Sequence, residues 1–166
     1  MFCCCQSVLG QAKLLRLVRD SMILQRDSKI NIWGWAFAGE KINVKYNGKN
    51  FRLTTGADGK WLLRLPAMKA GGPYSMEIKA SNKILLKDIL IGDVWLCSGQ
   101  SNMVHQMKLH NITYANDIAK ANYPEIRQFW IPTMTDMQGS HNDLPNGYWK
   151  SANPNDVAEF SVGARH

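Results

Sequence analysis

The chain has 166 residues, 45% of them hydrophobic and 20% charged, which is the composition of an ordinary globular protein of one or two domains. Its formal net charge of +7 comes from lysines and arginines scattered along the chain. Since it has no arginine-rich arm, zinc-finger spacing or aromatic RNA-binding signature, this charge indicates a solvated basic surface and argues against nucleic-acid binding. No stretch approaches the ~18 consecutive apolar residues of a membrane span, so none is predicted.

Residues 1–12, MFCCCQSVLGQA, are mostly apolar and end in small residues, as the tail of a signal peptide does. They lack a positively charged start, and their apolar run is short. Two interpretations therefore stay open: a degraded or truncated signal sequence, and a non-native start such as a misplaced start codon.

The four cysteines predict neither disulfides nor a metal site. Cys3, Cys4 and Cys5 are adjacent, and Cys97 stands alone in an apolar run. The chain has no CxxC pair and no Cys/His cluster with zinc spacing. We expect Cys97 to be a small core residue rather than a reactive thiol.

Residues 13–91 have the pattern of a β domain. Short apolar or alternating runs are separated by turn residues, and Asn47-Gly48 is a strong hairpin signal. Strands at this spacing predict a small β-sandwich. The expected strands span residues 29–37, 41–46, 50–55, 60–65, 74–80 and 84–91.

Three tryptophans of this region allow two interpretations. Trp33, Trp35 and Trp61 are able to stack on sugar rings in a carbohydrate-binding module. Trp33 and Trp35 also share one face of a strand, and large aromatic side chains dominate the cores of β-sandwiches. We therefore predict that these tryptophans pack in the core.

Residues 92–166 have a different pattern, which predicts the start of an α/β domain with a parallel sheet. The run at 94–97 predicts a buried strand, residues 111–122 a helix, and residues 126–131 a second buried strand. A second helix is expected at 156–164. Two strands are fewer than a doubly wound sheet needs, so we expect this domain to be truncated.

The segment Gly92–Asn102, GDVWLCSGQSN, carries the candidate chemistry. Its apolar run meets a cluster of small polar residues, which predicts a sharp turn at the carboxyl end of a strand. Ligands of open α/β sheets bind at the carboxyl ends of strands, where a serine can meet both a base and a substrate. Ser101 is the candidate nucleophile, with a helix-cap or turn serine as the structural alternative.

The string GDVWLCSGQSNM closely resembles the nucleophile block of the sialate O-acetylesterases, in the wider SGNH/GDSL-like group of serine esterases. By this resemblance Ser101 is the nucleophile, and Gly99, Gln100 and Asn102 form the rest of its motif. The strings SMILQR, IWGWA, IRQF, WKSA and FS fit the same family, so the likeness covers residues 12–162. It also implies an accessory β domain ahead of the esterase domain.

The resemblance implies an exported carbohydrate O-acetylesterase that needs neither a metal nor an organic cofactor. Ser101 would attack the acetyl carbonyl, and its backbone N–H would be one oxyanion donor. The partner would be an acetylated glycan, with sialic acid, xylan and other acetylated sugars left open. The sequence indicates no particular oligomeric state.

The other catalytic groups of the family have no recognisable counterpart before His166. These are the base histidine, the acid that orients it, and the remaining oxyanion donors. We therefore expect little esterase turnover from this chain. His105, four residues after Ser101, is a less favoured substitute base.

A second hypothesis comes from a different class of protein. The chain would then be a non-catalytic carbohydrate-binding or interaction module built on residues 13–91, inactive because its catalytic domain is incomplete. Loss of glycan binding on substitution of Trp33 or Trp35, but not of Ser101, would distinguish this module from an esterase.

Overall fold

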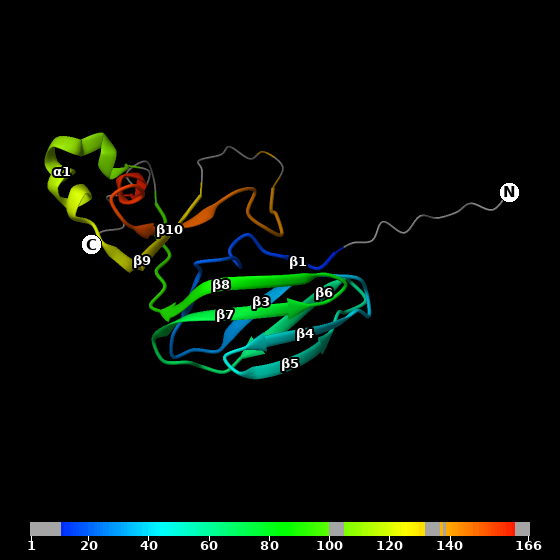
Figure 1. Cartoon of the computed structure of the whole chain (residues 1–166). Coiled ribbons are helices and arrows are strands. Elements are labelled where there is room, and N and C mark those ends of the chain that lie inside the picture. The colour runs from blue at the N-terminus through cyan, green and yellow to red at the C-terminus, as the bar shows by residue number, and fades with distance from the viewer. Residues whose placement is uncertain (1–10, 100–104, 132–136, 138, 162–166) are drawn as a thin grey trace.

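The computed structural model describes residues 11–99, 105–131, 137 and 139–161, which form a fold of mostly β-sheet with few helices (Figure 1). None of the helices in these ranges is long and apolar enough to cross a membrane. The strands are β1 (Lys13–Leu14), β2 (Ile23–Gln25), β3 (Ile30–Trp35), β4 (Lys41–Tyr46), β5 (Lys49–Thr54), β6 (Lys60–Leu65), β7 (Gly71–Lys79), β8 (Lys83–Gly92), β9 (Tyr123–Trp130) and β10 (Tyr148–Ala152). The helices are η2 (Met107–His110), α1 (Asn111–Lys120) and η3 (Val157–Glu159).

The first eight strands form two sheets. One has the order β1-β3-β6, and the other has the order β2-β8-β7-β4-β5. All of their pairings are antiparallel except that of β2 with β8, which makes the larger sheet mixed. In Figure 1 the larger sheet lies in front of β3 and β6. Asn47 and Gly48 both have positive φ and join β4 to β5, which confirms the predicted hairpin turn.

A single hydrophobic core lies between these two sheets. Alternate residues of β4 point inward, so Ile42, Val44 and Tyr46 pack in the same cluster as Ile32 of the smaller sheet. Burying one such aliphatic side chain stabilises the fold by about 1.5–3 kcal/mol. The alternation of apolar and polar residues in the sequence is thus the direct cause of the two-layer arrangement.

The tryptophans divide between the core and the surface. Trp61 is 2% exposed and lies in the core, as predicted, whereas Trp33 is 43% exposed. Trp35 is half-buried at the edge of the same core. The prediction that Trp33 packs in the core was wrong, because Ile30, Ile32 and Gly34 take the inward positions of β3 and leave Asn31 and Trp33 exposed on its outer face.

Residues after Gly92 form a smaller second cluster. Helix α1 confirms the predicted helix, and its Ile118 packs with the buried Met107, Ala152 and Val157. The predicted second helix is only the short η3, because the backbone of Phe160 is already extended and its carbonyl accepts a hydrogen bond from Met107 N–H at 3.0 Å. Figure 1 shows α1, β9 and β10 together at one end of the molecule.

Strand β9 corrects the predicted parallel arrangement. It begins at Tyr123, is exposed along its first half, and pairs with β10 in an antiparallel two-stranded sheet. The reason is that β10 runs back along β9, which places Tyr148 opposite Trp130 and Trp149 opposite Phe129. These two pairs of rings pack with centroids 5.4 and 5.3 Å apart.

Candidate active site

The structure describes only part of the predicted nucleophile motif. Gln100, Ser101 and Asn102 lie outside the described residues, whereas Gly99 is described and exposed. The start of the same segment is held in place by two contacts. Asp93 accepts a hydrogen bond from Arg26 Nε at 2.7 Å, and Val94 N–H donates to Gln25 Oε1 at 2.9 Å.

The apolar run before the motif is not the buried strand that its composition predicts. Residues 94–97 form no strand, Leu96 is 94% exposed, and Cys97 is an exposed free thiol rather than a core residue. A strand needs a neighbouring strand for its hydrogen bonds, and none of the described strands pairs with this run. The contacts of Asp93 and Val94 fix only the start of this segment.

A cavity of about 460 Å³ lies where this segment approaches β9. This volume is within the range of about 300–1,000 Å³ that is usual for small-molecule sites. Residues 97–99 line one side of it, and residues 128–131 line another. Gln106, Glu159 and Ser161 also contribute to the wall. The residues immediately before the predicted nucleophile motif thus border a cavity of suitable size for a sugar.

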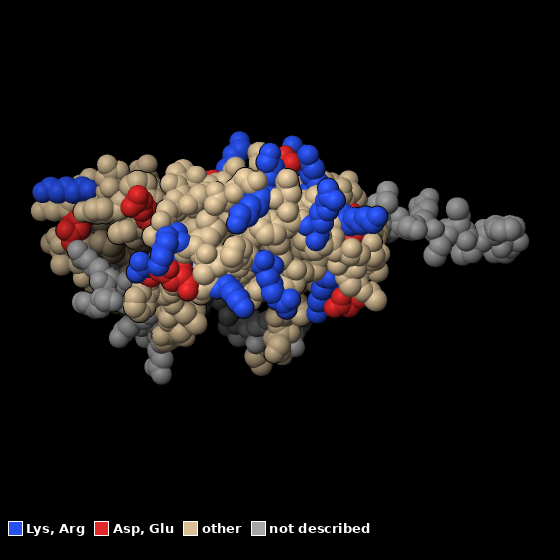
Figure 2. Space-filling model, turned by 90° about the horizontal axis from the view of Figure 1, so that it is seen from below, with Lys and Arg blue, Asp and Glu red and all other residues tan. Residues whose placement is uncertain are grey.

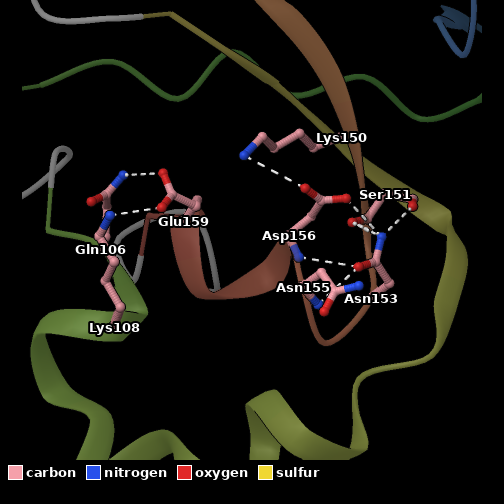
Figure 3. A network of polar contacts seen from close by, with 8 residues as sticks. All are labelled: Gln106, Lys108, Lys150, Ser151, Asn153, Asn155, Asp156 and Glu159. Carbon is pink, nitrogen blue, oxygen red and sulfur yellow. Dashed lines mark hydrogen bonds and ion pairs between the residues drawn. The ribbon is translucent and has the colours of Figure 1, made fainter.

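The side chains of Gln106 and Glu159 in the cavity wall are held by a network of hydrogen bonds (Figure 3). Glu159 accepts hydrogen bonds from Lys108 Nζ at 2.7 Å and from Gln106 Nε2 at 3.3 Å. The hydrogen bond from Lys108 lowers the pKa of the Glu159 carboxyl, against the opposing effect of partial burial. Glu159 is therefore a carboxylate at neutral pH and serves as an acceptor rather than as a general acid.

A second group of contacts fixes the turn that leads from β10 to η3. Asn153 Nδ2 donates to Asp156 Oδ2 at 2.8 Å and to Ser151 Oγ at 3.0 Å. Asp156 also forms an ion pair with Lys150 at 3.5 Å (Figure 3). These contacts hold η3, and with it Glu159, against the end of the cavity.

The structure pairs the two histidines near the motif with each other. His105 Nδ1 and His110 Nε2 lie 3.1 Å apart in an exposed contact. An activated serine needs a histidine that is oriented by a carboxylate, which is a different arrangement. Within the described ranges no group of three or more His, Cys, Asp or Glu side chains is placed to hold a metal ion.

Sequence reasoning did not identify Gln106, Gln128 or Glu159 as cavity residues. Gln128 stands in the family string IRQF and Glu159 immediately precedes the string FS, but neither spacing indicates a shared cavity. Their proximity depends on long-range contacts. One is the antiparallel bridge between Gln106 and Ser161.

Comparison with known proteins assigns the family. No family model matches the chain. The sialate O-acetylesterase of Rattus norvegicus is 38% identical over 128 residues, which are 69% of this chain and 23% of that protein. The human sialate O-acetylesterase is 32% identical over 98 residues, or 52% of this chain and 19% of that protein.

A solved structure gives the same result. The crystal structure of a carbohydrate acetylesterase from Xanthomonas citri matches with a TM-score of 0.85 and 35% identity, over 91% of this chain and 34% of that one. The chain belongs to the sialate O-acetylesterase family. It is thus a member of a family of acetyl ester hydrolases, and it spans about a fifth of the length of the curated relatives it matches. The fold described above is shared with an acetylesterase of this kind.

Proposed function

We propose that this chain forms the nucleophile-bearing part of a carbohydrate O-acetylesterase, with Ser101 as the nucleophile. The observation that carries the proposal is the cavity of about 460 Å³, because residues 97–99 on its wall lead directly into the motif that contains Ser101. Gly99, Gln100 and Asn102 would shape the turn that presents the serine hydroxyl.

The proposed reaction is a two-step acyl transfer. Ser101 Oγ attacks the carbonyl carbon of the acetyl ester while a base takes its proton, and the backbone N–H of Ser101 helps to stabilise the oxyanion. The C–O bond to the sugar breaks, and the sugar oxygen leaves with a proton. Water then hydrolyses the acetyl-serine to acetate. This sequence of steps uses neither a metal ion nor an organic cofactor.

We assign the remaining catalytic groups to the part of the relatives that this chain does not span. The histidine base and its acid would come from there, as would further oxyanion donors. The ring of His105 contacts His110 rather than a carboxylate, and a serine-activating histidine is oriented by a carboxylate, which supports this division. The chain alone is therefore expected to show little esterase turnover.

The substrate class is proposed to be O-acetylated sugars, with O-acetylated sialic acid first. The names of the relatives motivate this choice, and the cavity offers polar groups for sugar hydroxyls. Glu159 is an ionised acceptor, and Gln128 Oε1 is buried without a hydrogen-bond partner among the described residues. A buried acceptor that stays unpaired costs about 1–3 kcal/mol, which a bound hydroxyl or water would relieve.

We also propose a domain assignment and a location. Residues 13–91 would be an accessory β-sandwich, and residues 92–166 the start of an SGNH-like esterase domain. The protein would act outside the cytoplasm, as the family resemblance implies. Cell fractionation that recovers all of the expressed protein in the cytoplasm would exclude that location.

A chimera tests the role of Ser101. Residues 11–161 would replace the matching third of the Xanthomonas citri enzyme, to which this chain aligns over 91% of its length. The chimera is expected to hydrolyse O-acetylated sialic acid. Ser101→Ala should lower kcat by about 10³-fold or more, as for other serine nucleophiles. Ser75→Ala, at an exposed position of β7 that does not line the cavity, is the matched control and should retain most activity.

The outcome against the proposal is equally clear. A folded chimera in which Ser101→Ala keeps the activity of the parent would exclude Ser101 as the nucleophile. The control is the Xanthomonas citri enzyme with conservative substitutions at the same junctions. If it remains active while the folded chimera shows no turnover, this chain does not supply a working nucleophile for the active site.

A second candidate function rests on the outer face of the smaller sheet. Trp33 is 43% exposed there, and the opposite residue Leu62 is 41% exposed. An exposed tryptophan beside an apolar neighbour is suited to stacking on a sugar ring, so the chain would act as a carbohydrate-binding module. Binding of acetylated xylan that is lost in Trp33→Ala but kept in Ser101→Ala would favour this function.

A further inference from the structure

The outer face of the five-stranded sheet carries a row of basic residues. In the register of the sheet, Asn43 of β4 lies opposite Arg52 of β5 on one side and Lys79 of β7 on the other. Lys79 in turn lies opposite Lys83 of β8. Because neighbouring strands are about 4.8 Å apart, these side chains form one continuous row across four strands.

Two further lysines widen the row. Lys41 and Lys45 flank Asn43 on β4, point to the same side, and are exposed. Figure 2, which views the molecule from below, shows Lys and Arg side chains over much of the two-sheet part of the surface, with fewer Asp and Glu. We call the set Lys41, Lys45, Arg52, Lys79 and Lys83 the basic face.

Acidic residues neutralise only part of the basic face. Glu77 is the only acidic residue in β4, β5 and β7, and it forms ion pairs with Lys79 at 3.0 Å and Lys83 at 2.7 Å. Lys45 lies opposite Glu77 in the register of β4 and β7, but within the described parts of the chain no carboxylate forms an ion pair with Lys41, Lys45 or Arg52. These three cations repel one another and gain from an anion that lies over them.

The chemistry of the face selects the kind of anion. Its neutral residues are polar, and they include Asn43 and Asn50. The aromatic residues of the same strands, Tyr46, Phe51 and Tyr74, pack into the core instead. The face therefore lacks the exposed rings on which single-stranded nucleic acids and neutral sugars stack. Lysines, arginine and amides together suit a polymer that carries both carboxylates and hydroxyls.

We propose that the basic face binds an anionic glycan, a sialylated chain whose carboxylates lie over Lys41, Lys45 and Arg52. This inference rests on the proposed function, since it supposes that the acetylated sugars presented to the chain are acidic. The face would hold the polymer while acetyl groups are removed at the separate cavity beside β9. Its interaction is electrostatic and exposed, so salt must weaken it.

Binding of polysialic acid to the full chain tests the proposal. At low ionic strength the chain should bind, and ~0.5 M NaCl should abolish most of the binding. Lys45→Glu with Arg52→Glu should weaken binding at least tenfold. Lys29→Glu with Lys120→Glu changes the net charge equally at exposed sites outside the basic face, and should have little effect. If the charge reversals impair folding, Lys45→Gln with Arg52→Gln replaces them with the same expected direction.

Three results would overturn the inference. They are no binding by the folded chain, equal losses in the two double variants, and binding of single-stranded oligo-dT as tight as that of polysialic acid. The Ser101→Ala variant separates this inference from the proposed function, because it should bind polysialic acid as well as the parent. Binding that survives Ser101→Ala, together with an inactive chimera, would leave the basic face standing and reject the esterase proposal alone.

Discussion

The side chain of Arg127 in β9 donates hydrogen bonds to both the backbone carbonyl and the carboxylate of Asp88 in β8. Arg127 Nη1 donates to the Asp88 carbonyl at 2.6 Å, and Nη2 donates to Asp88 Oδ1 at 2.9 Å. The other carboxylate oxygen of Asp88 accepts a hydrogen bond from Ser21 at 2.9 Å, and the residue has a positive φ of 58°. Because the Arg127 side chain is only 5% exposed, this pair ties the cavity strand β9 firmly to the two-sheet unit.

We expect Arg127→Met to destabilise the chain by about 2–3 kcal/mol, because it removes several charge-assisted hydrogen bonds and leaves the Asp88 acceptors unpaired. Asp88→Asn keeps a residue that tolerates positive φ and should cost about 1 kcal/mol. Urea unfolding gives both values. Lys69→Met is the control, because its ion pair with Asp27 is exposed and should contribute nothing measurable. Equal effects of Arg127→Met and Lys69→Met would show that the pair does not join the two parts.

The opposite environments of Trp61 and Trp33 give a second prediction. Trp61→Ala should cost about 3–5 kcal/mol in the free energy of unfolding, because the ring fills the core. Trp33→Ala should cost less than about 1 kcal/mol, because the ring lies on the outer face of β3. Chemical denaturation of the two variants checks the difference. A large loss in Trp33→Ala would return that residue to a structural role and remove it as a sugar platform.

Gly34 provides a third prediction, since it lies beside the Trp61 ring. A Cβ atom at this position would be 2.9 Å from Trp61 Cζ2 and would also clash with the carbonyl oxygen of Lys13. We expect Gly34→Ala to destabilise the chain by about 1–3 kcal/mol through overpacking. Gly39→Ala is an unsuitable control because of its positive φ, so Ser75→Ala on the exposed side of β7 serves instead. If Gly34→Ala and Ser75→Ala unfold at the same urea concentration, the close approach is not present in solution.

Tyr46 predicts a loss of stability at high pH. Burial raises the pKa of its hydroxyl to about 12, and that hydroxyl has no hydrogen-bond partner among the described residues. The pKa of Tyr46 is higher in the folded chain than its ordinary value of 10.0. The stability that folding gains from keeping this hydroxyl protonated is therefore fully present below pH 10 and is lost as the pH rises towards 12. Tyr46→Phe should therefore flatten the stability profile between pH 10 and 12, and should raise stability at pH 7 by up to about 1 kcal/mol. An unchanged slope in Tyr46→Phe would place the titrating group elsewhere.

Local pattern was sufficient to predict much of the two-sheet unit. The alternation in Lys41–Tyr46 and the pair Asn47-Gly48 act within a few residues, so strand, turn and register all follow from the sequence. In β3, the two-residue period of a strand likewise predicts that Trp33 and Trp35 share a face. It does not show which face is inward, because that choice depends on Ile30, Ile32 and Gly34 meeting the other sheet.

The candidate site was harder to predict, because its parts come from distant segments. Residues 94–97 are apolar, but apolar character alone does not supply the neighbouring strand that a sheet requires. The sequence identified the motif of Ser101 through a family resemblance. It did not identify Glu159, whose position depends on Lys108 and Gln106 some fifty residues earlier in the chain.

The ion pair of Glu159 with Lys108 gives a last prediction, one that concerns pH. The pKa of Glu159 is lowered in the folded chain, so its stabilising contribution is present above the ordinary pKa of 4.5 and is lost as the pH falls through the lower folded pKa. Lys108→Met should therefore be less stable than the parent at pH 7. The difference should shrink at pH 3, which lies below the ordinary pKa of 4.5, because the unfolded parent then gains a proton that the ion pair resists in the folded chain. Lys120→Met, in the last turn of α1, should show no such dependence. Urea unfolding at the two pH values measures it, and a stability difference that is equal at both would mean that Lys108 acts through packing rather than through its charge on Glu159.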